Sequence, residues 1–181
     1  MKPGLVIRRA VRDDLPAFFL YLNDHLSDNG VCGTALFMPM PRDESRLPAD
    51  KEAAFRSGME TPVGQPGWRR AWIAVTGEGA IAGHIDLRAR PEKATGHRAL
   101  LGMGVHRDHR RQGLGEALIA AAGEWAAGET IDWIDREVLS VNEAARRLYA
   151  RCGFGQVGEL ADMFRIDGQS LGYTFMTRRV G

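Results

Sequence analysis

Hydrophobic and polar residues alternate with different periods along the chain, and these periods predict its secondary structure. The alternating stretch at residues 5–11 predicts a strand. Apolar residues at helical spacing predict a helix over residues 15–26, with Pro16 suited to its first turn. A second, shorter helix is expected over residues 49–59. The first third of the chain therefore reads as one strand followed by two helices.

Strands dominate the remainder of the chain. They are expected at residues 72–76, 80–88, 100–105, 133–141, 163–166 and 171–177, with helices at 113–127 and 142–152. The glycine turns at 77–79 and 167–168 join hairpins. The order β-α-α-β-β-β-α-β-α-β-β is typical of an α/β fold around one mixed sheet, and residues 1–181 are expected to form a single domain.

Composition narrows the classes of function. The chain has 181 residues, is 44% hydrophobic, and carries a formal net charge of +1, so no overall field attracts nucleic acid or anionic membrane. Its apolar runs fall short of the roughly 18 residues that a membrane span needs. Cys32 and Cys152 are too few for a disulfide framework or a four-cysteine zinc site, and the histidines are scattered. We expect a cytoplasmic protein without metal, nucleic-acid or membrane partners.

The segment between the strand at 100–105 and the helix at 113–127 is the most informative one. It reads R-R-Q-G-L-G-E from Arg110 to Glu116. The first turn of a helix presents unpaired N–H groups that bind phosphate, glycine lets an anion approach, and arginine adds positive charge. The segment therefore predicts a pyrophosphate site. The alternative is a tight turn with solvated arginines. The segment is not a Walker loop, because it has no lysine. It is not a Rossmann fingerprint either, because Leu118 stands where that motif needs glycine.

A second motif follows later in the chain, at residues 139–154, and it includes Asn142 and Tyr149. The R-x-x-G-x-G pattern at 110–115 resembles the acyl-CoA signature of the Gcn5-related N-acetyltransferase (GNAT) superfamily, and residues 139–154 resemble that family's second signature. The two motifs stand in the family's order, and the resemblance covers residues 5–179.

The resemblance implies a mostly antiparallel sheet with one splayed parallel pair of strands, helices on both faces, and the pantetheine arm of acetyl-CoA between the splayed strands. It implies that backbone groups of Met103, Gly104 and Val105 hold this arm and that Asn142 contacts the cofactor from the next helix. Gly102 and Gly104 are expected to keep the strand surface open. The implied cofactor-binding residues are Met103, Gly104, Val105, Arg110, Arg111, Gln112, Gly113, Leu114, Gly115, Glu116 and Asn142.

The activity implied by the resemblance is direct transfer of an acetyl group, in a ternary complex, to a primary amine of a small molecule or peptide. Tyr149 matches the family's general acid, because a phenol can protonate a leaving thiolate. The competing interpretation is a tyrosine that only packs its ring in the helix. A backbone N–H near Met103 would polarise the thioester carbonyl.

The general base is not given by the motifs. Relatives often place Glu or His at positions that align with Ala99 and Leu101, which are apolar in this chain. His84 and Asp86 share one face of the neighbouring strand and could relay a proton through water. A salt-bridged sheet face explains the same pattern equally well. Further candidates are His97, Glu137 and bulk water.

The acceptor site is expected between the first two helices and the strands that follow, lined by residues 28–30, 37–40 and 64–68. Its mixture of acidic and apolar residues favours an amine with a nonpolar neighbour. A small amine, an antibiotic-like substrate, an amino acid and a peptide N-terminus all remain open. So do a non-catalytic acyl-CoA sensor, a nucleotide-binding module unrelated to CoA, and a homodimer.

Overall fold

A computed structural model describes residues 4–31 and 33–180, and within them seven strands form one mixed sheet. Cys32 lies outside the described residues. The elements are β1 (Val6–Arg9), α1 (Leu15–Leu26), α2 (Ala49–Glu60), β2 (Arg69–Val75), β3 (Ile81–Ala89), β4 (Arg98–Val105), α3 (Leu114–Ala127), β5 (Trp133–Leu139), α4 (Glu143–Arg151), β6 (Gly155–Ile166) and β7 (Gln169–Arg179).

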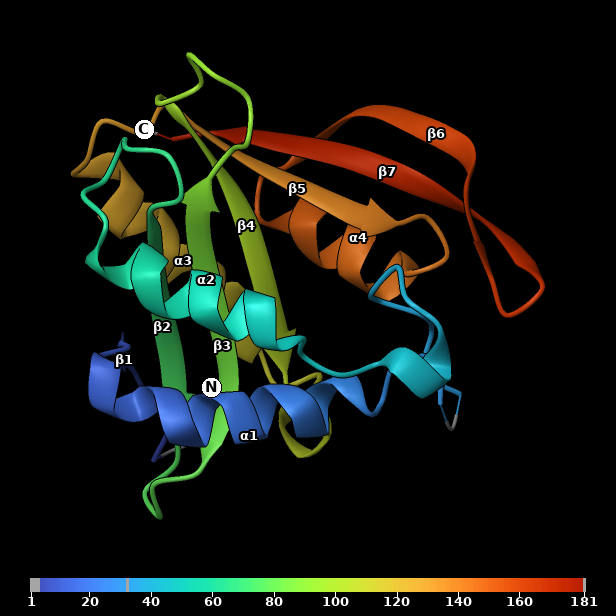
Figure 1. The fold of residues 1–181 in the computed structure, drawn as a ribbon, viewed down its shortest axis with the longest axis horizontal. Coiled ribbons are helices and arrows are strands. Elements are labelled where there is room, and N and C mark those ends of the chain that lie inside the picture. Colours follow the sequence, from blue (N-terminus) through green and yellow to red (C-terminus); the bar gives the residue numbers. More distant parts are fainter. Residues whose placement is uncertain (1–3, 32, 181) are drawn as a thin grey trace.

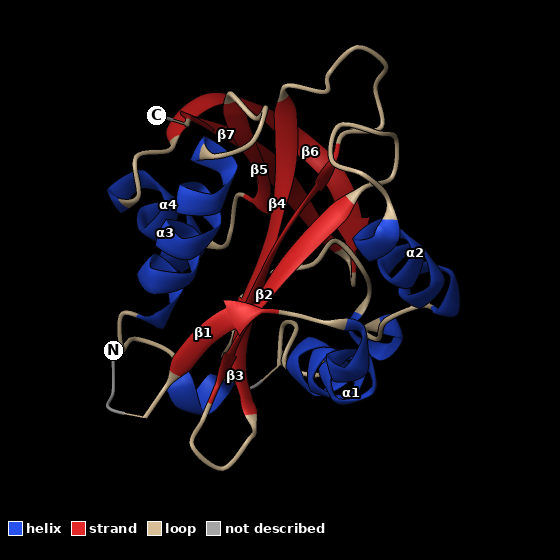
Figure 2. Ribbon diagram, turned by 90° about the vertical axis from the view of Figure 1, so that its left-hand side faces the viewer, coloured by secondary structure: helices blue, strands red, loops and turns tan. Residues whose placement is uncertain are grey.

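The strands lie in the order β1-β2-β3-β4-β5-β7-β6, and β4 with β5 is the parallel pair of this sheet. Helices α1 and α2 cover one face, and α3 and α4 cover the other (Figures 1 and 2). The expected fold class, a mixed and mostly antiparallel sheet with helices on both faces, is confirmed.

The parallel strands diverge soon after they begin. The register runs from Arg98 opposite Trp133 to Leu100 opposite Asp135 and then stops, although both strands continue. Figure 1 shows β4 and β5 separating towards the lower part of the sheet. The splay implied by the resemblance is therefore present. Its consequence is a stretch of β4 whose backbone groups face a gap instead of a neighbouring strand.

The two faces of the sheet have different cores. The face under α3 and α4 packs Ile85 and Leu87 with Ala99 and Leu101, all between 0% and 1% exposed. The opposite face packs the phenylalanines of α1 and α2 on β2. Because Ala99 and Leu101 lie in hydrocarbon, the positions where relatives often carry a base have only a packing role in this chain.

Several strands differ from the predicted bounds by one or two residues, and two of them begin clearly earlier than predicted. β6 begins at Gly155, well before the predicted start at residue 163, and β2 begins at Arg69. β6 is an edge strand, and residues 155–165 are exposed or half-buried, so it carries no apolar period. Among the described residues, no helix is long and apolar enough to span a bilayer.

Candidate active site

The turn that leads into α3 presents a row of free backbone donors. Among the described residues, no hydrogen-bond acceptor faces the N–H groups of residues 111–116. Gly113 precedes the helix with φ +78°, and Arg111 also has a positive φ of 58°. Left-handed backbone at both positions turns successive amides towards solvent at the positive end of the helix dipole. The arrangement is suited to an anion with several oxygens.

The side chains of this turn differ in their availability. Arg110 Nη2 lies 2.7 Å from Asp28 Oδ2, and Arg110 Nε donates to the carbonyl of Val105 at 3.0 Å. Arg110 is therefore not the free cation expected from the sequence, and its contribution to a phosphate site stays a prediction. Arg111 is exposed and pairs with no described side chain. The missing side chain of Gly115 makes room for Leu148, because a Cβ there would lie 2.9 Å from Leu148 Cδ2.

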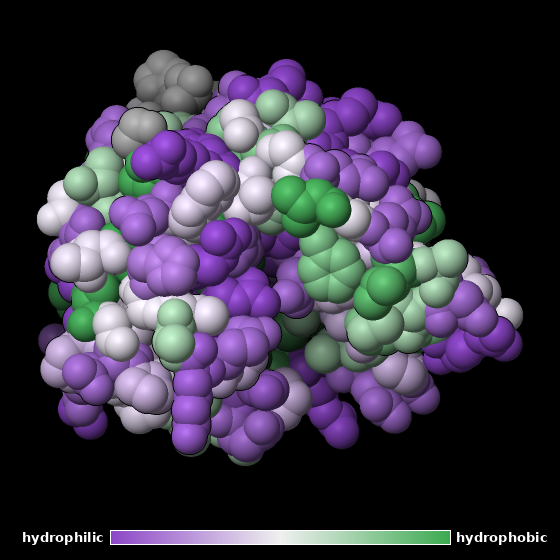
Figure 3. Space-filling view, turned by 90° about the horizontal axis from the view of Figure 1, so that it is seen from above, coloured by the Kyte–Doolittle hydropathy of each residue, from purple (hydrophilic) through white to green (hydrophobic). Residues whose placement is uncertain are grey.

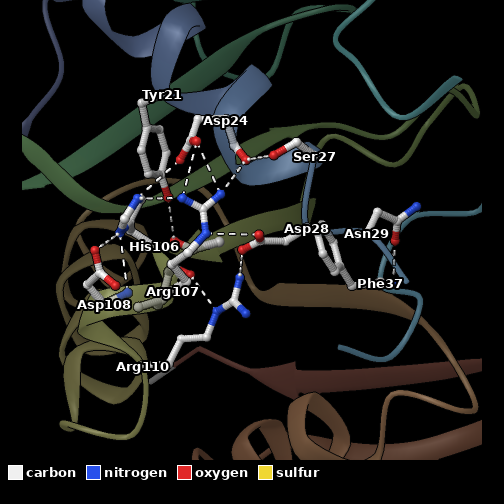
Figure 4. A network of polar contacts seen from close by, with 12 residues as sticks. Tyr21, Asp24, Ser27, Asp28, Asn29, Phe37, His106, Arg107, Asp108 and Arg110 are labelled. Carbon is white, nitrogen blue, oxygen red and sulfur yellow. Dashed lines mark hydrogen bonds and ion pairs between the residues drawn. The ribbon is translucent and has the colours of Figure 1, made fainter. Parts of the chain in front are cut away.

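An ion-pair network ties the end of α1 to this turn (Figure 4). Arg107 bridges Asp24 at 3.1 Å and Asp28 at 2.9 Å, and His106 lies 3.1 Å from Asp24. Burial opposes ionisation of Asp24, but Arg107 outweighs it and holds the pKa of that carboxyl below its ordinary value. The network fixes the position of the turn relative to α1.

The gap between β4 and β5 exposes alternate residues of β4. Arg136 on β5 donates from Nη1 to the carbonyl of Leu101 at 2.9 Å, immediately beyond the last paired residues. Since backbone groups of alternate residues point the same way, Met103 and Val105 also face the gap. The Gly104 carbonyl points to β3 and lies 3.2 Å from the position of a Cβ on Gly83. Of the three expected residues, Met103 and Val105 therefore have backbone groups that face the gap, whereas the Gly104 carbonyl faces β3.

Tyr149 lies at the side of this gap. Its ring is 2% exposed, packs edge-on against Phe154, and has the Arg136 guanidinium 5.3 Å from its centroid. Among the described residues, its hydroxyl has no hydrogen-bond partner. Asn142 caps α4 by accepting from the N–H of Ala145 at 3.2 Å. The ring is thus held by packing, and its hydroxyl remains available.

The face of β4 that lies towards α1 is covered by a cluster of side chains, of which the sequence analysis predicted only His84 and Asp86. His84 and Asp86 share a face of β3, as predicted, and lie opposite Gly104 and Gly102. The expectation that these glycines keep the strand open is wrong. A Cβ on Gly102 would lie 2.3 Å from Asp86 Oδ2, and one on Gly104 would lie 2.4 Å from His25 Nε2, so the chain's own side chains fill this space.

Tyr21 and His25 of α1 complete this cluster, and the sequence analysis missed both. The Tyr21 hydroxyl lies 3.1 Å from His84 Nδ1 and donates to the Gly104 carbonyl at 3.1 Å. His25 is stacked between Tyr21 and Phe37, and its Nδ1 is buried without a partner. The sequence did contain one signal for them: they are four residues apart, so they lie on the same face of the helix as its apolar stripe.

The two predicted base residues have different surroundings. Asp86 pairs with Arg69 at 3.4 Å and Arg88 at 3.2 Å; burial opposes its ionisation, but the two arginines keep the pKa of the carboxyl lowered. Burial lowers the pKa of His84 to about 4, and Asp86 opposes this. Burial likewise lowers the pKa of His25 to about 3. A salt-bridged carboxylate and two neutral imidazoles therefore face β4.

A hollow of about 580 Å³ opens over residues of β4, β5, β6 and β7. Figure 3 shows the molecule from above, with its surface hollowed and hydrophobic residues gathered on one rim. The lining includes Arg90, Arg98, Asp135, Glu137, Val157 and Phe175. Asp135 is neutralised by Arg98 and Arg90, whereas Glu137 forms no ion pair among the described residues.

Parts of the predicted acceptor lining have other roles. Trp68 is 1% exposed and packs against Trp125 in the core under α3. Asn29 is fully buried, where its side chain accepts from the N–H groups of Phe37 and Met38 and so shapes the loop after α1. Asp28 forms ion pairs with Arg107 and Arg110. For Trp68 and Asn29 the prediction is wrong, because one side chain packs in the core and the other closes a loop.

Comparison with known proteins gives consistent results. The model of the Acetyltransferase (GNAT) family matches residues 38–154. An aminoglycoside N(6')-acetyltransferase type 1 from Klebsiella aerogenes is 34% identical over 92 residues, which are 49% of this chain and 60% of that protein. The match thus spans less than two thirds of this relative's length.

Solved structures share the fold over nearly the whole chain. An acetyltransferase of the GNAT family from Streptococcus pneumoniae has a TM-score of 0.79 and 23% identity, covering 98% of this chain and 99% of that one. A putative acetyltransferase from Salmonella typhimurium, solved with its cofactor acetyl-CoA, has a TM-score of 0.78 and 20% identity, with coverage of 98% and 95%.

Proposed function

The chain belongs to the Acetyltransferase (GNAT) family, and from this premise we propose that it transfers an acetyl group from acetyl-CoA to a primary amine of a small molecule or peptide. Transfer is direct, within a ternary complex of enzyme, acetyl-CoA and amine. The observation that carries the proposal is the row of unpaired N–H groups at residues 111–116, which continues into the open edge of β4 at Met103.

The residues present fit acetyl-CoA. The free amides of residues 111–116 suit the pyrophosphate, with Arg111 as the exposed cation beside them. The backbone of Met103 and Val105 faces the gap and suits the amide-rich pantetheine arm. When bound, acetyl-CoA supplies an activated acyl carbon and a thiol leaving group. Because β4 runs towards α3, the acyl end of the arm would lie near Leu101 and Arg136.

Three side chains and one backbone N–H around this point have the chemistry that transfer needs. His84, neutral at physiological pH because burial lowers its pKa to about 4, accepts the proton that the attacking amine loses. The Met103 N–H polarises the carbonyl. Tyr149 donates its hydroxyl proton to the departing sulfur. Asp86 acts through its charge, since it favours a proton on the neighbouring imidazole.

The acceptor amine enters through the hollow beside β5. Asp135 is opposite Leu100 on β4, so the hollow adjoins the face that carries Asp86 and His84. Glu137 gives it a carboxylate for a cationic amine, and Phe175 with Val157 gives it an apolar wall. The favoured acceptor therefore carries an amine next to a nonpolar group.

A thiol-release assay with acetyl-CoA and a panel of primary amines tests the proposal. We expect release of free thiol with at least one amine, with the N-acetylated product identified by mass spectrometry. His84→Gln should reduce turnover and leave coenzyme A binding, followed by calorimetry, within about twofold. Cofactor binding without thiol release across the panel would contradict acetyl transfer and favour the acyl-CoA sensor.

A further inference from the structure

We infer that Tyr21 is a positioning residue that holds His84 in its Nδ1–H tautomer, so that Nε2 is the atom that accepts the proton. The inference rests on the proposed function for its role in catalysis. The tautomer itself is a property of the folded chain and is measurable without any substrate.

The assignment follows from the number of protons that a phenol carries. The Tyr21 oxygen lies 3.1 Å from the carbonyl oxygen of Gly104 and 3.1 Å from His84 Nδ1. A carbonyl oxygen only accepts, so the single proton of Tyr21 is directed to Gly104. His84 Nδ1 must then be the donor to Tyr21. In a neutral imidazole this leaves Nε2 without a proton.

The charge states required by this scheme agree with the surroundings. Burial raises the pKa of Tyr21 well above its ordinary value, so the hydroxyl keeps its proton. Burial lowers the pKa of His84 to about 4; Asp86 opposes this effect, and Arg136 and Arg69 add to it. The ring is thus neutral near pH 7 and carries one N–H.

Packing prevents the ring from turning over. Phe18 and Tyr21 meet the His84 ring edge-on at 5.3 and 5.5 Å, and His25 does so at 6.1 Å. On the strand side, a Cβ on Gly104 would lie 2.9 Å from His84 Cε1, so the ring rests on bare backbone. Because three aromatic rings and the strand confine it, the imidazole keeps one orientation.

The second ring nitrogen remains available. Among the described residues, His84 Nε2 has no hydrogen-bond partner, yet it is not one of the fully buried unpaired nitrogens. It therefore retains contact with solvent. The Gly104 carbonyl that anchors Tyr21 points towards β3 and away from the gap, so this anchoring takes no backbone group from the acyl-CoA side.

Long-range ¹H–¹⁵N NMR of the imidazole nitrogens at pH 7.5 tests the inference, with the His84 signals assigned from the His84→Gln spectrum. Wild-type protein should show His84 protonated on Nδ1. Tyr21→Phe removes one oxygen atom and should shift the ring towards the Nε2–H tautomer. Its kcat should fall about tenfold, with the KM for acetyl-CoA within about twofold.

Phe19→Leu is the matched control, because Phe19 is a buried aromatic residue of the same helix that packs towards α2 and Phe55. This variant should lower the melting temperature and leave both the tautomer and kcat unchanged. An Nε2–H signal in the wild type, or an unchanged Nδ1–H signal in Tyr21→Phe, would overturn the inference. Absence of acetyl transfer to any amine would overturn the proposed function alone, since the tautomer is read without substrate.

Discussion

The two halves of the site that meet at β4 are built from different parts of the chain. On the α3 side, most of the groups available to a ligand are backbone ones, at residues 111–116 and at Met103, and the side chains of Arg111 and Tyr149 add to them. On the α1 side they are the side chains of Tyr21, His25 and His84, which pack over Gly104. A half built from backbone should tolerate changes of side chain wherever its conformation survives. A half built from packed side chains should not.

Tyr149→Phe should give the largest effect, because it removes the one hydroxyl that the gap side contributes to the chemistry. We expect kcat to fall by about 10²-fold, within the range for loss of a general acid, with coenzyme A affinity unchanged. Steady-state kinetics and calorimetry measure the two quantities. Unchanged turnover would mean that Tyr149 only packs its ring.

Asn29→Ala separates a structural residue from a substrate-binding one. The buried amide closes the loop through Phe37, Met38 and Ser45, so its loss should reduce the free energy of unfolding by about 2–3 kcal/mol. Urea unfolding measures this change, and the exposed Asp43→Ala in the same loop is its control. A stable variant with a raised KM for the amine would restore Asn29 to the acceptor site.

Gly113→Ala and Arg111→Ala compare backbone with side chain inside the α3 turn. An L-residue at φ +78° costs about 1–2 kcal/mol, so Gly113→Ala should weaken coenzyme A binding about tenfold. Arg111→Ala should weaken it only about threefold, and less at high salt. Calorimetry at two ionic strengths measures both. The reverse order of effects would show that side-chain charge, not the amides, holds the ligand.

Acid titration of stability probes the α1 half. The pKa values of His25 and His84 fall to about 3 and about 4 in the folded chain, so between pH 6 and 4 the unfolded state binds more protons. Stability should therefore decrease as the pH falls, by about 1.4 kcal/mol per pH unit for each histidine. The paired carboxylates, with lowered pKa values, lose their contribution mainly at the acid end of this window and below it.

His25→Phe should reduce the pH dependence of the free energy of unfolding by the contribution of one histidine. Urea unfolding at several pH values measures this change. The exposed His97→Gln is the control for loss of an imidazole. An unchanged slope in His25→Phe would show that His25 is already charged in the folded protein.

The sequence was sufficient for most of the fold and for the backbone half of the site. Apolar periods predicted α1 and α3 because each buries one stripe, and the glycine and arginine spacing at 110–115 marks a contiguous turn whose function depends on local conformation. The first part of β6, before residue 163, was not predicted, because an exposed edge strand needs no apolar period.

The side-chain half could not be predicted to the same extent. His25 and Tyr21 fit the apolar stripe of α1 as ordinary core residues, and their partners His84 and Gly104 are distant in sequence. Asp28 shows the same limit. Its neighbours in sequence suggested a place in the acceptor site, whereas it pairs with Arg107 and Arg110, about 80 residues later in the chain. Such contacts depend on how the elements pack.

An amide ¹H–¹⁵N NMR titration of the ¹⁵N-labelled chain with coenzyme A tests the central claim most directly. If the α3 turn binds the pyrophosphate, the largest shifts should fall on residues 111–116, followed by Met103 and Val105. Saturating coenzyme A that leaves those amides unmoved, or that shifts another surface, would contradict the account.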